Sequence, residues 1–195
     1  MSTSNTGAPS TSADFNRQYT SKGHWMWSDT RIPHELKELV TADKPRNSLE
    51  LGCGLGRFSE YMADHEIAAT AVDFSSVAIE RARERVSNKF YQPTYLVGDV
   101  THLDMLTEPF DFAFDVGCFH CLDAEAQQKY IQEAYRLLKP GAILLIWTLD
   151  HSPSDMKLTP EYMDQTFFGR FCLVKSKASR RRIIASHWYW LMREE

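Results

Sequence analysis

Short apolar runs alternate with amphipathic segments along most of the chain. The apolar runs of strand length are residues 47–51, 68–72, 95–98, 110–116 and 142–149. The segments between them carry apolar side chains every three to four positions, which is the helical period. Near-continuous apolar strands that alternate with helices are typical of a mostly parallel sheet covered on both faces. The pattern therefore predicts an α/β fold of the doubly wound type.

The helical segments begin at recognisable signals. The predicted helices occupy residues 33–40, 57–65, 75–86 and 123–138. Pro33 suits the first position of a helix, where its missing N–H costs nothing. Ser75 and Asp123 are favoured N-cap residues, because their side-chain oxygens accept from free backbone N–H groups.

The amino-terminal part of the chain departs from this alternation. Residues 1–13 are rich in Ser, Thr, Asn, Gly and Pro and carry almost no apolar side chains, so we expect a disordered tail. A short helix is expected at residues 14–22, with Phe15 and Tyr19 on one face. The length of 195 residues favours one domain, which we place at residues 14–195.

The carboxyl-terminal part reads as two strands around a basic turn. Residues 167–175 and 183–192 are strand-like, and Arg180-Arg181-Arg182 lies between them. This order predicts an antiparallel hairpin at a sheet edge. We interpret the three arginines as a solvated hairpin tip, with a binding patch as the alternative.

The overall composition narrows the class of partner. Hydrophobic residues make up 43% and charged residues 25% of the chain, as in ordinary globular proteins. The net charge of −4 gives no electrostatic reason to expect a nucleic acid or a membrane as partner. No apolar run approaches the ~20 residues that span a bilayer, and no signal-peptide pattern is visible. We therefore expect a cytoplasmic protein, as a monomer or homodimer.

The cysteines do not suggest a disulfide framework. They are Cys53, Cys118, Cys121 and Cys172. The stretch 118–121 reads C-F-H-C, but one such pair supplies too few ligands for a closed zinc site. We predict no metal and interpret these thiols as part of a strand-to-helix loop, with a metal or redox role as the alternative.

The glycine-rich stretch 52–56 (G-C-G-L-G) lies between the first strand and its helix and follows Glu50. A turn without Cβ atoms lets the backbone approach a ligand closely. The dinucleotide fingerprint is G-x-G-x-x-G, whereas here the third glycine comes one place early and Arg57 stands in its position. A carboxylate at the strand end would repel a pyrophosphate but suit a ligand with positive charge.

The run from Glu50 to Gly56 resembles the first motif of class I S-adenosylmethionine (SAM)-dependent methyltransferases. SAM carries an ammonium and a sulfonium but no phosphate. Further features follow in the order typical of that family: Asp73 ends the second strand, Asp99-Val100 follows the third, and Lys139-Pro140-Gly141 precedes the fifth. The resemblance implies a Rossmann-like seven-stranded sheet of order 3-2-1-4-5-7-6, closed by a C-terminal antiparallel hairpin.

The resemblance also implies where the nucleoside of SAM binds. Asp73 lies about 20 residues after the glycine loop, the offset at which an acidic residue bonds ribose hydroxyls. Phe74 and Val100 are expected to sandwich the adenine, and Asp99 to accept from its amino group.

The methionine portion of SAM is expected at the glycine loop. Glu50 and the backbone of residues 52–54 would face it, and the carbonyl of Val116 or Gly117 would take the ammonium. For Glu50 or Asp115, the alternative is a helix-dipole or salt-bridge partner. The predicted cofactor-binding residues are Trp27, Glu50, Gly52, Cys53, Gly54, Asp73, Phe74, Asp99, Val100, Val116 and Gly117.

Trp27 enters that set through a second resemblance. Residues 24–33 carry Trp25 and Trp27 before Pro33, and resemble the W-x-x-x-x-x-P segment of small thiopurine- and tellurite-type methyltransferases. In those enzymes the segment closes over the cofactor, so we expect a lid within residues 14–41. The alternative is that both tryptophans belong to the core.

Methyl transfer is an in-line displacement, so the protein mainly aligns the acceptor and excludes water. A base is required only for an acceptor that is protonated at working pH. His120, after the fourth strand, is the first candidate acid/base and His151, after the fifth, the second; a structural role is the alternative for each.

We predict a SAM-dependent methyltransferase that produces S-adenosylhomocysteine and acts on a small thiol, phenol or nitrogen heterocycle. One alternative acceptor is a chalcogen or metalloid species (tellurite, selenium or arsenic). Another possibility is a SAM-binding sensor or partner protein without activity. An NAD-dependent oxidoreductase is disfavoured by the missing third glycine.

Overall fold

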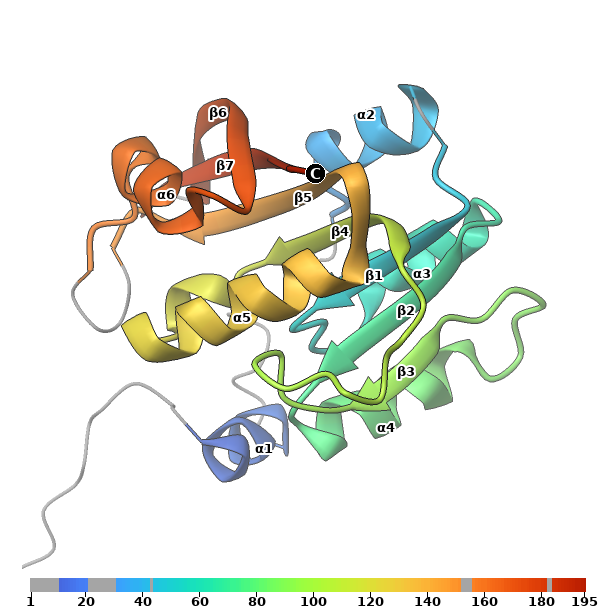
Figure 1. Ribbon diagram of the computed structural model, residues 1–195. Helices are drawn as coiled ribbons and strands as arrows, with labels where there is room; N and C mark the ends of the chain where they lie inside the picture. Colours follow the sequence, from blue (N-terminus) through green and yellow to red (C-terminus); the bar gives the residue numbers. More distant parts are fainter. Residues whose placement is uncertain (1–10, 21–30, 43, 152–155, 182–183) are drawn as a thin grey trace, which may run out of the picture.

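The computed structural model describes residues 11–20, 31–42, 44–151, 156–181 and 184–195 (Figure 1). The helices are α1 (Ser12–Thr20), α2 (His34–Ala42), α3 (Arg57–Asp64), α4 (Ser76–Val86), α5 (Ala124–Leu137) and α6 (Pro160–Phe167), with a short 3₁₀ turn, η2 (Phe119–Cys121). The strands are β1 (Asn47–Leu51), β2 (Ala68–Asp73), β3 (Thr94–Val97), β4 (Phe110–Val116), β5 (Leu138–Leu149), β6 (Phe171–Arg181) and β7 (Ile184–Arg193).

The seven strands form one sheet of order β3-β2-β1-β4-β5-β7-β6, which confirms the predicted architecture. Strands β1 to β5 are parallel, and β7 runs antiparallel to both β5 and β6. The carboxyl ends of the parallel strands therefore meet at one edge of the sheet. There the chain leaves β1 at Gly52, β2 at Phe74, β4 at Gly117 and β5 at Asp150.

Helices cover both faces of the sheet, as expected for a doubly wound fold (Figure 1). On one face, Tyr130 of α5 and Phe167 of α6 are buried in a cluster with Ile146 of β5. On the other face, Leu36 of α2 and Met62 of α3 belong to a second buried cluster. Ile79 and Ala82 of α4 pack against Ala71 and Tyr95 in a third cluster. Within the described residues, no helix combines the length and apolar character needed to cross a bilayer.

The first helix begins earlier than predicted. Residues 12 and 13, expected in the disordered tail, form the first turn of α1, whereas residues 21 and 22 of the predicted helix lie outside the described residues. Thr11 and Asp14 explain the start, because their side chains exchange hydrogen bonds with each other's backbone N–H at 3.2 and 3.1 Å. This reciprocal arrangement is a capping box with a shorter acid.

The expected strand at residues 167–175 is partly wrong. Phe167 ends helix α6, which was not predicted, and the strand begins only at Phe171. Thr159 caps α6 by accepting from the Tyr162 N–H at 3.2 Å, and Pro160 opens it. Thr159-Pro160 was therefore a readable start signal. Strand β5 also begins at Leu138, four residues before the predicted start.

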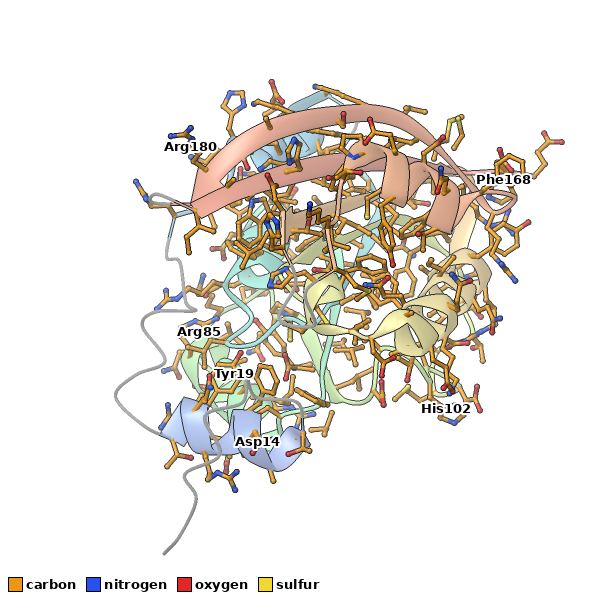
Figure 2. All side chains as sticks on the ribbon, turned by 90° about the vertical axis from the view of Figure 1, so that its left-hand side faces the viewer. Asp14, Tyr19, Arg85, His102, Phe168 and Arg180 are labelled. Carbon is orange, nitrogen blue, oxygen red and sulfur yellow. The ribbon has the colours of Figure 1, made fainter. Side chains whose placement is uncertain are left out.

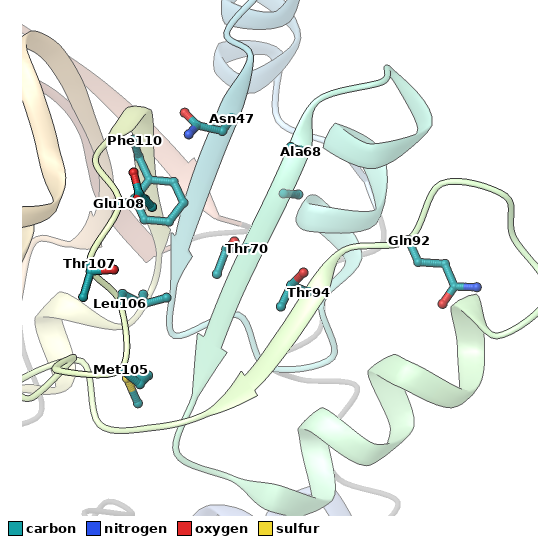
Figure 3. Close-up of a pocket in the computed structure, with 11 residues that line it drawn as sticks. Asn47, Ala68, Thr70, Gln92, Thr94, Met105, Leu106, Thr107, Glu108 and Phe110 are labelled. Carbon is teal, nitrogen blue, oxygen red and sulfur yellow. The ribbon is translucent and has the colours of Figure 1, made fainter.

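Residues 98–109, all described, connect β3 to β4 without a helix. Part of the sheet face over β2 and β3 consequently borders a cavity of about 400 Å³ (Figure 3). Its lining includes Asn47, Ala68 and Thr94, which start β1, β2 and β3. The cavity thus lies at the end of the strands opposite to the edge where the glycine loop leaves β1.

Candidate functional site

The glycine loop after β1 is held in a backbone shape that side chains disfavour. Gly52, Gly54 and Gly56 have φ angles of 71°, 51° and 66°, in the left-handed region that glycine tolerates. A Cβ on Gly52 would lie 2.6 Å from the Cys118 sulfur, and one on Gly56 would lie 2.6 Å from the Tyr95 oxygen. The Tyr95 hydroxyl donates to the Gly56 carbonyl at 2.7 Å. The loop therefore requires glycine for two reasons: its φ angles are positive, and Cys118 and Tyr95 pack closely against it.

Asp73 ties this loop to the next strand end. Its carboxylate accepts from the Gly54 N–H at 2.7 Å and from the Ser75 N–H at 2.9 Å. Burial raises the pKa of Asp73, while these two hydrogen bonds act in the opposite direction. The structure thus brings the predicted ribose ligand and the predicted glycine loop into direct contact.

Glu50 points beneath the loop toward helix α3. Its carboxylate accepts from the Ser59 N–H at 2.9 Å and from the Ser59 hydroxyl. The side chain is 2% exposed, and this burial raises the pKa of Glu50 to about 8. Burial thus favours the protonated carboxyl in the protein alone, and a nearby cation would favour its ionised form. The geometry fits the alternative of a helix N-terminal partner, and contact with the methionine portion stays a prediction.

Asp115 plays a similar structural part at the end of β4. It accepts from the Cys118 and Phe119 N–H groups at 2.7 and 2.9 Å and from the Tyr130 hydroxyl at 3.0 Å. Burial raises the pKa of Asp115 to about 7. Asp115 therefore shapes the turn that starts at Gly117, whose φ is 102°.

Helix α1 covers the β2–α4 turn, next to the glycine loop. The rings of Phe15 and Phe74 lie 5.0 Å apart. The Ser12 hydroxyl donates to the Phe74 carbonyl at 2.9 Å, and the Ser75 hydroxyl donates to the Asn16 side-chain oxygen at 2.6 Å. The half-buried Phe74, predicted to contact adenine, is therefore flanked by a helix whose aromatic face was expected from the sequence.

Tyr19 is a site residue that the sequence analysis did not assign. Its oxygen lies 2.5 Å from the place where a Cβ on Gly54 would stand. Burial raises the pKa of Tyr19, and the charge of Asp73 adds to the effect. Figure 2 labels Tyr19 on α1. Two aromatic residues four positions apart in a polar segment were the signal that could have identified it.

Asp99 and Val100, the predicted adenine contacts after β3, lie on the same edge of the sheet but interact with their own neighbours. Asp99 is exposed, and its carboxylate accepts from the Thr101 N–H at 2.8 Å and from the Thr101 hydroxyl at 2.7 Å. Val100 is buried in the main core cluster. The local turn leaves the adenine role of Asp99 as a prediction.

Of the two predicted catalytic histidines, His120 is buried and His151 is exposed. His120 is 4% exposed rather than on an open rim, and its ring lies 6.0 Å from the Trp147 ring. The Leu149 N–H donates to His120 Nδ1 at 3.5 Å. His151 forms a backbone bridge with Lys157 after β5. Trp27 lies outside the described residues.

The thiols near this edge are not activated nucleophiles. All four cysteines are free. Burial raises the pKa of Cys53 and of Cys118 well above the ordinary value, and that of Cys121 to about 12. These three thiols therefore stay protonated at neutral pH.

Known proteins carry the same fold and the same central segment. Residues 49–141 match the family model described as "Methyltransferase domain". The tRNA N(3)-methylcytidine methyltransferase trm140 of Schizosaccharomyces pombe is 27% identical over 175 residues, covering 84% of this chain and 50% of the relative. The malonyl-[acyl-carrier protein] O-methyltransferase of Salmonella typhimurium is 30% identical over 115 residues, covering 58% and 43%. The chain thus spans about half the length, or less, of these curated relatives.

The crystal structure of the N-methyltransferase NodS from Bradyrhizobium japonicum WM9, in complex with S-adenosyl-L-homocysteine, is similar over 96% of this chain and all of that chain. Its TM-score is 0.79 at 18% sequence identity. The segment matched by the family model contains the glycine loop and Asp73, and the fold around it is similar to that of a methyltransferase crystallised with S-adenosyl-L-homocysteine.

Proposed function

We propose that this domain transfers the methyl group of SAM to a small-molecule nucleophile, such as a thiol, phenol or nitrogen heterocycle. The observation that carries the proposal is the link between Asp73 and the Gly54 amide at 2.7 Å. This link sets a buried carboxylate beside a strained glycine loop at the carboxyl end of parallel strands, which is where nucleosides bind in such sheets.

The cofactor assignments follow the strand ends. Asp73 takes the ribose hydroxyls, Phe74 and Val100 flank the adenine, and Asp99 accepts from the adenine amino group once its turn with Thr101 adjusts. The methionine portion lies along the loop backbone at residues 52–54, above Cys53 and near Glu50. Its ammonium faces the carbonyl groups of Val116 and Gly117.

Binding of the cationic cofactor has an electrostatic consequence. A positive charge near Glu50 favours the carboxylate, so the raised pKa falls on binding and a proton is released. A pyrophosphate would gain no such attraction, because it would keep the carboxyl protonated and neutral.

The proposed acceptor side is formed by η2, by Asp150 and His151 after β5, and by Trp147 with the neighbouring His120. Residues 98–109, which could have carried an inserted acceptor domain, form only a short link. The short link favours a compact acceptor, and His120 and His151 are the proposed acceptor-side histidines. A thiopurine- or tellurite-type acceptor is the finer version of the same proposal.

A nucleoside within RNA is a second candidate acceptor, because a relative is a tRNA methyltransferase. The hairpin offers some positive charge: Lys175 lies over the Trp190 ring at 4.4 Å, and Arg180 is exposed near the end of β6 (Figure 2). Lys177, however, is paired with Glu35 at 2.8 Å. The expected absence of nucleic-acid binding is therefore left to experiment.

The test uses the full chain and SAM with a labelled methyl group. The acceptor panel contains aliphatic thiols, phenols, nitrogen heterocycles, selenite, tellurite and total tRNA, and calorimetry with S-adenosylhomocysteine and with NADH measures cofactor choice. Transfer to a small acceptor supports the proposal, and transfer to tRNA alone supports the second candidate. Tight binding of S-adenosylhomocysteine without any transfer contradicts both and favours a sensor.

A further inference from the structure

Two side chains beyond the predicted set form an acid–base pair at the acceptor edge. His187 Nδ1 lies 2.6 Å from an Asp150 carboxylate oxygen. Asp150 directly follows β5, and His187 pairs with Thr148 across the β5–β7 ladder. Their side chains are 22% and 27% exposed. The pair is therefore sheltered, yet a molecule bound at the edge can reach it.

The partners of the two buried or half-buried histidines at this edge fix opposite tautomers. A carboxylate only accepts, so in the neutral ring of His187 Nδ1 carries the hydrogen and Nε2 the lone pair. His120 Nδ1 instead accepts from the Leu149 N–H at 3.5 Å, which places the hydrogen of the neutral ring on Nε2. His120 is thus arranged to donate at Nε2, whereas His187 is arranged to accept a proton there.

The strand register puts His187 level with the methyl-transfer end of the site. Val116 pairs with Trp147, so Gly117 and Thr148 are level, and Thr148 pairs with His187. Two strand spacings separate Gly117 from His187, which is about 10 Å. A small acceptor lying over the ends of β4 and β5 spans this distance together with the imidazole, directly or through one water.

Fastening the chain after β5 does not require this pair. The Asp150 N–H donates to the Ala185 carbonyl at 3.1 Å, and the Asp150 carbonyl accepts from the Leu158 N–H at 2.9 Å. The first of these bonds anchors the segment to β7, and the second joins it to the chain before α6. A partly exposed ion pair adds little stability to such an anchor, so the aligned dyad calls for a chemical role.

We propose that His187 is the general base of methyl transfer and that Asp150 is its positioning residue, an inference that rests on the proposed function. A lone pair of the acceptor atom attacks the methyl carbon of SAM, and the carbon–sulfur bond breaks. The electron pair of that bond stays on sulfur, which gives neutral S-adenosylhomocysteine. The proton of the acceptor passes to His187 Nε2 and then to solvent.

This assignment defines the acceptor class. A base accelerates transfer only to acceptors that are protonated at working pH, such as phenols near pKa 10 or aliphatic thiols near 8.5. Two groups contact the His187 ring: the Asp150 carboxylate, at 2.6 Å, and Tyr189, whose ring stacks on the imidazole at 5.8 Å. Burial raises the pKa of Tyr189, and the charges of Asp150 and Glu161 add to the effect.

The experiment compares His187→Gln and Asp150→Asn with the unaltered full chain. His102→Gln is the matched control, because His102 also faces an aspartate, Asp104, at 3.3 Å but is 75% exposed. Each variant is assayed with a phenol and with an acidic aromatic thiol that is already ionised. We expect His187→Gln and Asp150→Asn to lose about 10²- to 10⁴-fold in rate with the phenol. The ionised thiol should react within about threefold of the unaltered rate, and the control should match the unaltered protein.

The pH profile gives a readout that a structural role would not move. With the phenol, the rate of the unaltered protein should depend on pH, and His187→Gln should change the shape of that dependence. Equal losses with phenol and thiol, or no loss with phenol, would overturn the assignment while leaving the proposed function intact. Transfer to no acceptor by the unaltered protein would instead contradict the proposed function, and the assignment with it.

A second measurement does not depend on any acceptor. Imidazole ¹⁵N spectra of the unaltered chain should show His187 protonated at Nδ1 and free at Nε2, and Asp150→Asn should mix the tautomers. A hydrogen on Nε2 of His187 in the unaltered protein would overturn the proposal.

Discussion

Asp73 offers the sharpest test of the cofactor site. Replacing it with alanine removes the acceptor of two buried backbone N–H groups, at 2.7 and 2.9 Å, and the proposed acceptor of two ribose hydroxyls. Hydrogen bonds to a charged group contribute about 1.5–3 kcal/mol each. Two lost ribose bonds therefore weaken SAM binding by about 3–6 kcal/mol, which corresponds to roughly 10²- to 10⁴-fold.

Calorimetry with S-adenosylhomocysteine measures this loss, and we expect at least a tenfold weaker affinity for Asp73→Ala. Asp123→Ala is the matched control, because Asp123 also accepts from a backbone N–H, that of Ala126 at 2.9 Å, but caps α5 on the surface. The control should lose about 1 kcal/mol of unfolding free energy, as is usual for a lost cap, and keep its affinity. A folded Asp73→Ala protein with unchanged affinity would refute the ribose assignment.

Three further predictions concern the loop and its cover. The pKa of Glu50 is raised from 4.5 to about 8, so the folded state holds this proton more tightly and the free energy of unfolding falls as pH rises between these values. Urea titrations at several pH values should show a weaker fall for Glu50→Gln. The same fall in this variant would refute the role of Glu50. Gly56→Ala should lower the free energy of unfolding by about 2–4 kcal/mol, through backbone strain and overlap with Tyr95. Gly169 has a φ of 79° but nothing within 4 Å of its Cβ position, so Gly169→Ala should cost only about 1 kcal/mol. Equal losses would contradict the close packing of Tyr95 against Gly56. Tyr19→Ala should weaken S-adenosylhomocysteine binding about tenfold, or ~1.4 kcal/mol, and Tyr19→Phe should weaken it by less than about threefold. If both variants keep the unaltered affinity, Tyr19 is not part of the site.

The central part of the fold was predictable because its signals are local. The apolar run at 110–116 and the N-caps Ser75 and Asp123 depend only on neighbouring residues, and both caps accept hydrogen bonds as expected. Helix α6 was missed although Thr159-Pro160 marks its start, because Phe167 was assigned to the following strand-like run. The strand order came from a resemblance to a family, since no local pattern specifies which strands pair.

The site was less accessible to sequence reasoning. Asp73 and the glycine loop were expected at one site, because their spacing reflects a recurring strand–helix–strand unit, but the hydrogen bond between Asp73 and the Gly54 N–H was not predicted. The pairing of His187 with Asp150 depends on the antiparallel register of β5 and β7, and no signal in the sequence near either residue predicts it. The burial of His120 likewise depends on packing against Trp147.

Helix α1 contributes no fully buried residue to the domain, and its described contacts fall mostly on the rim of the nucleoside site. It touches the β2–α4 turn through Phe74 and Ser75, approaches Gly54 through Tyr19, and receives a hydrogen bond from Arg81 at the Tyr19 carbonyl. Docking of this helix and binding of the nucleoside therefore involve the same few groups. Each must change the free energy of the other by the same amount. Whatever tethers, trims or modifies the amino-terminal segment will register as a change in nucleoside affinity, and the nucleoside will in turn alter how readily proteases cut that segment.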